Sequence, residues 1–354
     1  MRRVLRVGFD MTPAITGGTG IARYVIELSA ALEDAGVDVR RFAVGRASEP
    51  VPPDTRHVRM PLRVVGRSWS TVGRPRVESL VGPVDLVHAS GPVLPASRAP
   101  RVSVFYDLAP LDHPDLHPPR AVAQLRHQVA SLDRVAGVVA ISTTTAEHLV
   151  GYGVPAERIV VTPCGHRALP PGDEPALAGR TYVLAVGQLV PRKGLDVLVQ
   201  AMARLDPAVH LALVGPSDGE EPELRRIATA LGIAERVHFA GRVSDAALAG
   251  WYAHAWALAA PSIEEGFGLP LLEAMATGLP VVASDIAVFR EITGGHASFV
   301  PVGDVGALAA ALTALLEDPV AHERLVAAGR AQAASFTWER CAEITLATYH
   351  RILT

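Results

Sequence analysis

Two glutamates, Glu265 and Glu273, carry the clearest chemical signal in this chain, because they flank a glycine-containing turn that leads into a predicted helix. Glu265 lies in the loop, and Glu273 is expected in the first turn of that helix. A carboxylate accepts two hydroxyl hydrogen bonds, so the pair suits a sugar or a ribose. Backbone amides of the same turn would point toward such a ligand; they belong to Phe267, Gly268 and Leu269. Taken singly, Glu265 also fits an ordinary surface loop, and Glu273 fits a carboxylate that stabilises a helix dipole.

Two adjacent cations, Arg192 and Lys193, follow a predicted strand and precede a predicted helix. Arginine binds an oxyanion with two parallel hydrogen bonds and lysine supplies a compact charge. The two together therefore suit a diphosphate. The alternative is a solvated basic turn.

A glycine-rich loop, residues 17–20, lies where the first predicted strand leads into the first predicted helix. Backbone amides and the helix dipole favour a phosphate at such a place. The dinucleotide fingerprint GxGxxG fails because Arg23 occupies its third glycine position, and no P-loop motif is present. A nicotinamide-dependent or P-loop enzyme is therefore disfavoured, and a plain glycine turn explains the loop equally well.

Short β-branched runs alternate with helical patterns, which predicts an α/β fold with parallel sheets. In the first half we expect helices at residues 20–35, 120–135 and 143–152, and a turn at 12–19. The expected strands of this half are residues 4–11, 85–89, 102–106, 137–141 and 159–162.

A connection between two domains is predicted at residues 163–180, which contain four prolines and three glycines. We therefore expect a first domain over residues 1–170 and a second, doubly wound domain over 171–336. The second domain is expected to hold a helix at 194–205 and strands at 182–186, 210–214, 237–240, 257–260, 281–283 and 298–300. Residues 337–354 form a last helix, which we expect to pack back across the first domain. Because ligands bind beyond the carboxyl ends of parallel strands, the loops there should carry the chemistry.

Composition excludes several classes of function. The 33 Lys plus Arg residues against 36 Asp plus Glu residues give a net charge of -3, which lacks the signature of a nucleic-acid binder. Cys164 and Cys341 lie far apart without metal-ligand spacing, which argues against a zinc site or a disulfide framework. We see no signal peptide and no uncharged membrane-spanning run, so a cytoplasmic protein is expected.

The stretch from Glu265 to Glu273 resembles the Glu-x7-Glu signature of family four of the retaining glycosyltransferases. Other segments follow in the family's order, and the resemblance covers essentially the whole chain. These segments are Gly18-Thr19-Gly20-Ile21-Ala22-Arg23-Tyr24, Phe105-Tyr106-Asp107-Leu108, Pro191-Arg192-Lys193-Gly194 and Phe239-Ala240-Gly241-Arg242-Val243-Ser244. The resemblance implies the GT-B fold, in which two Rossmann-like domains face a cleft, the first binding the acceptor and the second the nucleotide sugar. The opening segment is also similar to bacterial enzymes that add mannose or rhamnose.

The resemblance further implies roles for individual residues. Glu265 would bind hydroxyls of the donor sugar, Glu273 would bind the ribose, and Lys193 with Arg192 would neutralise the diphosphate leaving group. The other donor-binding positions would be Gly20, Gln188, Val243, Gly266, Phe267, Gly268 and Leu269.

Two positions depart from the family pattern. Many members have an arginine where this chain has Gln188, whose neutral amide donates a hydrogen bond but adds no charge. Many also have a histidine where this chain has Tyr106, and a tyrosine with a pKa of about 10 is a poor base at neutral pH. On the acceptor side we therefore place Gly18 and Tyr106, with Asp107 as the nominated catalytic carboxylate. Asp107 also fits a residue that braces its loop.

The implied reaction is transfer from a nucleoside-diphosphate sugar to a hydroxyl of a glycan, a glycolipid or a small molecule. It would proceed by front-face substitution with retention, in which cations and amides stabilise the leaving diphosphate and a phosphate oxygen takes the acceptor proton. No metal and no other cofactor are expected, since Arg192 and Lys193 supply the positive charge. Although retaining glycosidases use paired carboxylates, neither Glu265 nor Glu273 is assigned as a nucleophile.

Two other functions stay open. A hydrolysing nucleotide-sugar epimerase of the same fold would change the donor without any acceptor. A non-catalytic scaffold would bind nucleotide sugar without turnover, and the departures at Gln188 and Tyr106 favour this second alternative.

One local bias concerns a further partner. Between Arg56 and Arg76 the chain has six arginines and no acidic residue, interleaved with apolar residues. Such a segment could make weak peripheral contact with the inner face of a membrane or with an anionic acceptor. A solvated arginine-rich loop is the alternative.

Overall fold

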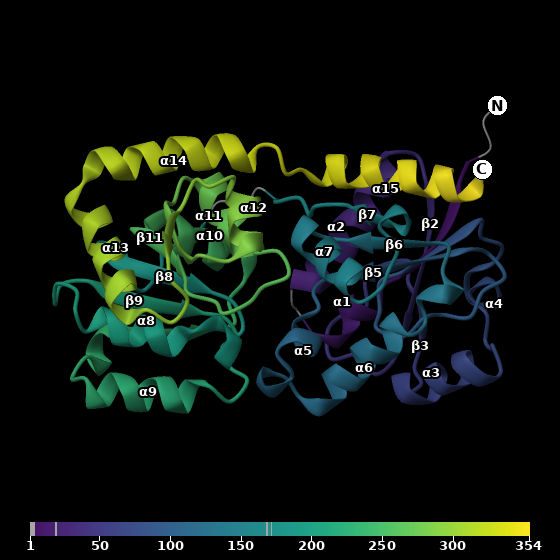
Figure 1. Cartoon of the computed structure of the whole chain (residues 1–354), viewed down its shortest axis with the longest axis horizontal. Helices are drawn as coiled ribbons and strands as arrows, with labels where there is room; N and C mark the ends of the chain where they lie inside the picture. Colours follow the sequence, from purple (N-terminus) through teal and green to yellow (C-terminus); the bar gives the residue numbers. More distant parts are fainter. Residues whose placement is uncertain (1–3, 18–19, 168, 171) are drawn as a thin grey trace. The chain divides into compact units, whose positions relative to one another are not determined.

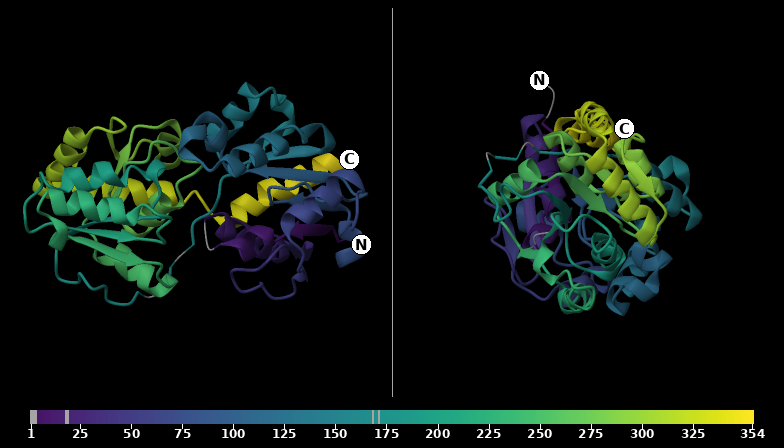
Figure 2. Two further views of the ribbon diagram at one scale, coloured as in Figure 1. Left: turned by 90° about the horizontal axis from the view of Figure 1, so that it is seen from below. Right: turned by 90° about the vertical axis from the view of Figure 1, so that its left-hand side faces the viewer.

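The computed structural model describes residues 4–17, 20–167, 169–170 and 172–354. It divides the chain into two compact units, of which unit 1 comprises Met1–Gly165 with Thr337–Thr354, and unit 2 comprises His166–Phe336. Each unit is built on one parallel sheet that is covered by helices (Figures 1 and 2). The predicted α/β class with two parallel sheets is therefore confirmed.

Unit 1 contains a seven-stranded sheet in the order β3-β2-β1-β4-β5-β6-β7. Its strands are β1 (Arg6–Asp10), β2 (Asp38–Val44), β3 (Arg56–Val58), β4 (Leu86–Ala89), β5 (Arg101–Phe105), β6 (Gly137–Ala140) and β7 (Ile159–Val161). The strand order reverses between β1 and β4, so the connections that leave these two neighbours diverge. Such a reversal is where ligands bind in doubly wound sheets.

The helices of unit 1 differ in part from those expected. They are α1 (Thr12–Thr16), α2 (Gly20–Asp34), α3 (Leu62–Thr71), α4 (Val77–Val81), α5 (Ala109–Asp112), α6 (Pro119–Val129), α7 (Thr143–Gly151) and α15 (Trp338–Leu353), with short 3-10 turns at Pro114–Leu116, Leu132–Arg134 and Ala156–Arg158. The expected turn at 12–19 was wrong over its first half, since α1 forms there with a proline near its start. The expected helix at 120–135 ends at Val129, and a separate 3-10 turn follows.

The strand β2 was not predicted because its sequence begins with charged residues. Arg40 and Arg41 lie on this strand, and their guanidinium groups pair with Asp38 and Glu33 respectively. The second half of β2 is buried, where Phe42 and Val44 pack with residues of α3 and α4. Half of the strand therefore lacks the apolar pattern that marks its neighbours.

The C-terminal helix α15 lies beside α2 in unit 1 (Figures 1 and 2). The hydroxyl of Tyr349 lies 2.7 Å from Nδ1 of His88 on β4, and both side chains are fully buried. The ring of His88 also stacks on Phe9 of β1, with 4.6 Å between ring centroids. Residues from the end of the chain thus complete a core whose other members come from its first quarter.

Unit 2 contains a six-stranded sheet in the order β10-β9-β8-β11-β12-β13. Its strands are β8 (Tyr182–Val186), β9 (His210–Val214), β10 (Val237–Gly241), β11 (Ala257–Ala260), β12 (Val281–Ser284) and β13 (Ser298–Val300). Four of them, β8, β9, β11 and β13, have the predicted bounds. The strand order reverses between β8 and β11.

Helices cover both faces of this second sheet. They are α8 (Leu195–Met202), α9 (Glu221–Ala230), α10 (Asp245–His254), α11 (Leu269–Thr277), α12 (Ala287–Thr293), α13 (Val305–Glu317) and α14 (Pro319–Ala333), with 3-10 turns η4 (Pro191–Lys193) and η5 (Ala234–Arg236). Figure 1 shows α8 and α9 on one face of the sheet and α10, α11 and α12 on the other. One apolar core joins α8, α9 and α13 to the strands. Within the described residues, none of the helices has the length and apolarity needed to cross a bilayer.

Acid should destabilise unit 1 through His88. Burial lowers the pKa of His88 to about 3, whereas a histidine in the unfolded chain has a pKa of about 6.5. Above a pH of about 6.5, His88 is neutral in both states and does not reduce the free energy of unfolding. As the pH falls from about 6.5 toward 3, the unfolded chain binds a proton that the folded chain does not, and the free energy of unfolding decreases by about 1.4 kcal/mol per pH unit.

Calorimetric unfolding at stepped pH measures this slope. His88→Gln should make the transition of unit 1 less sensitive to pH, and His127→Gln, at an exposed histidine of the same unit, should leave the sensitivity unchanged. Equal slopes for wild type and His88→Gln would contradict the assignment.

Candidate functional site

Two loops of unit 2 emerge side by side, because β8 and β11 are neighbours in the sheet. The first loop runs from Gly187 into the 3-10 turn η4, and the second runs from Pro261 to Gly268. A backbone hydrogen bond of 2.8 Å from Ile263 N to Arg192 O joins them. The strand reversal therefore brings two segments together that lie far apart in the sequence.

The close approach of the two loops requires a glycine at position 194. Gly194 has a φ of 61°, and a Cβ atom there would lie 2.2 Å from the carbonyl oxygen of Pro261. No side chain fits such a distance, so the backbone of the two loops can meet only at a glycine. This contact fixes the position of Lys193, which directly precedes Gly194.

A cluster of charges lies where the loops meet. Lys193 Nζ pairs with Oε1 of Glu265, and Arg192 Nη1 lies 3.1 Å from Oε2 of the same carboxylate. Ser262 Oγ also donates to Oε1, at 3.1 Å. Only 10% of the Glu265 side chain is exposed, against 15% of Lys193 and 25% of Arg192. We call these four residues the Lys193 cluster; they are Arg192, Lys193, Ser262 and Glu265.

The cations control the ionisation of Glu265. Burial alone would raise the pKa of this carboxyl group, but the charges and hydrogen bonds of Lys193 and Arg192 outweigh burial and lower the pKa to about 2. Glu265 is therefore ionised at neutral pH, and the Lys193 cluster contains two positive charges and one negative charge. Lys193, Ser262 and Glu265 line part of a pocket together with Gly268 and Phe289.

Lys193 carries a signal that the pattern of motifs does not reveal. It is the single lysine among the 33 Lys plus Arg residues of the chain. Arginine serves at every other basic position, so the composition favours arginine strongly. Lys193 is the one exception, and its compact ammonium group differs from a planar guanidinium group in shape and hydrogen-bond geometry.

The carboxylate of Glu273 binds a residue outside the Lys193 cluster. The helix α11 begins at Leu269, so Glu273 is its fifth residue and belongs to the second turn. The expectation of a first-turn position was wrong, because Gly268 takes a left-handed φ of 106° and caps the helix. Glu273 is 4% exposed and accepts a hydrogen bond of 2.8 Å from the hydroxyl of Tyr252 on α10.

Tyr252 was missed by sequence reasoning. It is 1% exposed and lies 21 residues before Glu273, so no local motif links the two. Only the packing of α10 against α11 brings them together. Its hydroxyl binds one oxygen of the Glu273 carboxylate and fixes the orientation of that group.

The remaining donor-side positions surround the two loops or lie on neighbouring connections. Phe267 is buried, and its ring meets Phe336 edge-on at 6.1 Å between centroids. Gly266 precedes it in the loop, and Leu269 opens α11. Gln188 donates to Asp218 at 3.1 Å and is thus directed toward the loop after β9. Val243 is half-buried in the turn between β10 and α10.

Unit 1 has its own site candidates at the carboxyl end of β5. Tyr106 and Asp107 follow this strand, and Tyr106 donates to the carbonyl of Ser90 at 3.2 Å. Burial raises the pKa of Tyr106 well above its usual value, so its phenol stays neutral. A pocket of about 140 Å³ lies here, and its lining includes Ile21, Tyr106, Asp107, Pro110, Leu125 and Gln128.

The glycine loop of unit 1 is described only in part. Gly20 is the first residue of α2 and is exposed. Gly18 lies outside the described residues.

A buried carboxylate at the strand reversal of unit 1 was also missed. Asp10 ends β1 and is 2% exposed. Its two oxygens accept hydrogen bonds of 2.9 Å from the amides of Thr12 and Gly91. Burial raises the pKa of Asp10, and these hydrogen bonds oppose the rise. Asp10 thus joins the ends of β1 and β4. The sequence feature that could have indicated it is an acidic residue at the end of an apolar strand.

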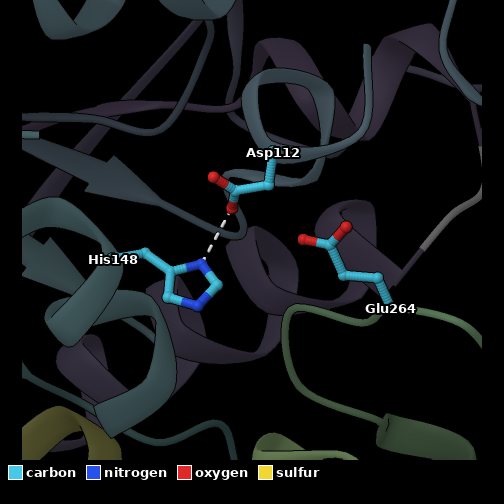
Figure 3. Close-up of side chains that lie close together, drawn as sticks. All are labelled: Asp112, His148 and Glu264. Carbon is cyan, nitrogen blue, oxygen red and sulfur yellow. Dashed lines mark ion pairs between the residues drawn. The ribbon is translucent and has the colours of Figure 1, made fainter. Parts of the chain in front are cut away.

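The carboxylate of Asp112 in unit 1 binds two side chains, one on α7 and one on the residue that directly follows α7. Asp112 accepts from His148 Nδ1 at 2.9 Å, as Figure 3 shows, and from the hydroxyl of Tyr152 at 2.8 Å. The sequence patterns did not indicate this group. It anchors the short helix α5 to α7.

The arginine-rich segment is ordered in the structure. It forms β3 and α3, with Val65 and Trp69 of α3 buried in the core of unit 1. Arg63 and Arg67 are exposed on the same helix. Contact with a membrane stays a prediction.

Comparison with known protein families gives two matches that together span most of the chain. Residues 18–167 match the family described as Glycosyltransferase Family 4. Residues 173–332 match the family described as Glycosyl transferases group 1.

Curated relatives carry related names. The O-antigen chain mannosyltransferase B of Escherichia coli is 30% identical over 280 residues, which are 75% of this chain and 74% of the relative. The D-inositol 3-phosphate glycosyltransferase of Kribbella flavida is 32% identical over an alignment that covers 99% of this chain and 95% of the relative.

Solved structures agree with the fold. The sucrose-phosphate synthase of Thermosynechococcus elongatus superposes with a TM-score of 0.79 at 26% identity, covering 98% of this chain and 99% of the other. Anabaena HepE in complex with UDP-glucose gives a TM-score of 0.74 at 21% identity, covering 98% and 100%. The chain has the two-domain GT-B fold, and it belongs to family 4 of the glycosyltransferases.

Proposed function

We propose that this glycosyltransferase moves a hexose from a nucleoside-diphosphate sugar to a hydroxyl group with retention of configuration. The observation that carries the proposal is the Lys193 cluster at the strand reversal of unit 2, where Arg192 and Lys193 offer two positive charges from one turn. A nucleoside diphosphate that leaves the sugar develops negative charge, and preorganised cations stabilise it most where water is scarce. The limited exposure of Lys193 meets this condition.

The proposed chemistry needs no separate catalytic base. As the bond between the anomeric carbon and the diphosphate oxygen breaks, the acceptor hydroxyl attacks on the same face of the sugar. A phosphate oxygen of the leaving group takes the hydroxyl proton. Arg192 and Lys193 bind that leaving group and so supply the charge that a divalent cation supplies in other transferases.

The donor is proposed to lie across the loop between β11 and α11. Glu265 would accept hydrogen bonds from hydroxyls of the sugar, and the amides of Phe267 and Gly268 would bind the sugar or the phosphate. Glu273, oriented by Tyr252, would accept a hydroxyl of the ribose. Backbone groups around Val243 would meet the base. UDP-glucose in the HepE structure supports a nucleotide-sugar donor.

The acceptor is proposed to bind the pocket of unit 1 beside Tyr106 and Asp107. Much of its lining is apolar, and Asp107 and Gln128 add groups that can bind hydroxyls. The names of the relatives, which include an O-antigen mannosyltransferase and inositol-phosphate glycosyltransferases, support a glycan or a polyol as acceptor. An epimerase or a scaffold would make a different product or none.

Nucleotide binding without metal is the first expected result. A scan of UDP, GDP, ADP, CMP and dTDP in the presence of a chelator should raise the melting temperature with one nucleotide, because a ligand of the folded state stabilises it by mass action. Glu273→Ala should abolish the rise. The absence of a shift with every nucleotide would contradict the donor site.

Lysine itself should be needed at position 193. Lys193→Ala should lower transfer about tenfold or more, because it removes stabilisation of the leaving group. Lys193→Arg keeps the charge and should also lower transfer, because the guanidinium group does not match the ammonium geometry. Product analysis with and without acceptor separates transfer from epimerisation, and near-normal transfer by both variants would refute the assignment.

Tyr252→Phe should weaken binding of the ribonucleoside diphosphate about tenfold or more, the effect of one hydrogen bond to a charged group. The 2′-deoxy or the 3′-deoxy nucleotide, whichever lacks the hydroxyl that Glu273 accepts, should bind both proteins equally. The matched control is Tyr152→Phe, which removes the hydroxyl that donates a hydrogen bond to Asp112 in unit 1. An equal loss for ribo and deoxy ligands would mean that Tyr252 acts on the fold alone.

A further inference from the structure

Glu265 already occupies the two cations that the proposed function assigns to the diphosphate. Lys193 Nζ and Arg192 Nη1 bind different oxygens of the same carboxylate, in a place where Glu265 is 10% exposed. A diphosphate would present its own oxygens to the same cations. The Glu265 carboxylate and a bound diphosphate would therefore both be anions that use Lys193 and Arg192 as partners.

The hydrogen bonds of Glu265 leave it little capacity for a sugar. A carboxylate has about four acceptor sites. Oε1 receives Lys193 and Ser262, and Oε2 receives Arg192. A sugar with two hydroxyls at Glu265 would have to displace at least one of these donors, and the donors that a bound diphosphate attracts are the two cations.

We propose that Glu265 competes with the diphosphate for Lys193 and Arg192, so that the cations exchange the carboxylate for phosphate oxygens when the donor binds. This inference rests on the proposed function. The exchange releases acceptor sites on Glu265 for sugar hydroxyls at the moment the donor arrives. After transfer, Glu265 recaptures the cations and favours release of the nucleoside diphosphate.

The strength of the existing pairing makes the competition significant. Charges attract each other more strongly in a partly desolvated site than in water. The low pKa of Glu265, about 2, reports how strongly the cations hold the carboxylate. Each phosphate contact with Lys193 or Arg192 therefore forms at the expense of a strong existing contact.

A role in positioning alone predicts the opposite effect on affinity. If Glu265 only held the cations in place, its neutral replacement would let them move and would weaken binding of a diphosphate. If Glu265 competes, the same replacement frees both cations and tightens binding. Glu265→Gln, which keeps the size of the side chain, separates the two roles.

The test is the affinity of wild type and Glu265→Gln for the nucleoside diphosphate selected by the melting scan, measured by titration calorimetry. We expect Glu265→Gln to bind this nucleotide about tenfold more tightly at low salt, with the gain shrinking as salt screens the cations. The corresponding nucleoside, which has no phosphate, should bind both proteins equally. Transfer should fall in the variant because the sugar loses its carboxylate. Unchanged or weaker binding of the diphosphate would overturn the proposal.

A matched variant controls for overall charge. Glu223→Gln removes the same charge from the exposed surface of α9 in the same unit, where Glu223 is 48% exposed and pairs with Arg226. It should leave the affinity for the nucleotide within about twofold of wild type, as expected for a surface charge. Equal tightening in both variants would overturn the proposal in favour of a general effect of net charge.

Inorganic pyrophosphate separates this inference from the proposed function. If no nucleotide binds wild type, the proposed function fails. Tighter binding of pyrophosphate by Glu265→Gln would then still support competition at the cations, and unchanged binding would overturn that as well.

The single lysine gives a second measurement. An amine-reactive reagent can modify only Lys193 and the terminal amine, and peptide mass analysis distinguishes them. Loss of the carboxylate releases Nζ of Lys193 from its ion pair, so Lys193 should react faster in Glu265→Gln than in wild type. The nucleoside diphosphate should slow the reaction in both proteins. Equal reactivity of Lys193 in the two proteins would overturn the pairing on which the proposal depends.

Discussion

The reversal of strand order between β8 and β11 is the constraint on which the chemistry of unit 2 depends. Neighbouring parallel strands deliver their following loops to the same edge, and a reversal leaves room between the helices that depart on opposite faces. Here the room is reduced by the contact of Gly194 with the Pro261 carbonyl. Two loops held so close place a lysine and a glutamate in direct contact, although 72 positions of sequence separate them.

The two units use the same topology for different chemistry. At the reversal of unit 1, both oxygens of Asp10 are taken by backbone amides, so the carboxylate joins strand ends. At the reversal of unit 2, the carboxylate of Glu265 is held by side-chain donors of Lys193, Arg192 and Ser262. A backbone amide cannot leave without disturbing the fold, but a lysine side chain can. The two carboxylates therefore differ in how firmly their partners are tied to the backbone.

The sequence predicted the structure well where one physical requirement, burial, shapes both the local residue pattern and the element. Strands such as β8 and β9 are continuous apolar runs, and a strand buried on both faces needs such a run, so their bounds could be predicted. The loops with Lys193 and Glu265 could be placed because loops follow strands. The strand β2 could not be predicted, since its first residues are charged; Arg40 pairs with Asp38 of the same strand, and Arg41 pairs with Glu33 of α2. Neither could the contact of Tyr252 with Glu273, which exists only because two helices pack.

The position of α15 has a consequence for how the protein is made. This helix belongs to unit 1, but it follows the whole of unit 2 in the chain. During synthesis, the first 165 residues leave the ribosome without the helix that covers His88 and α2. Unit 2 has all of its strands and helices by Phe336 and can fold first as a continuous segment. The unit that is translated first is therefore completed last, and an interrupted chain would display an uncovered apolar face to chaperones and proteases.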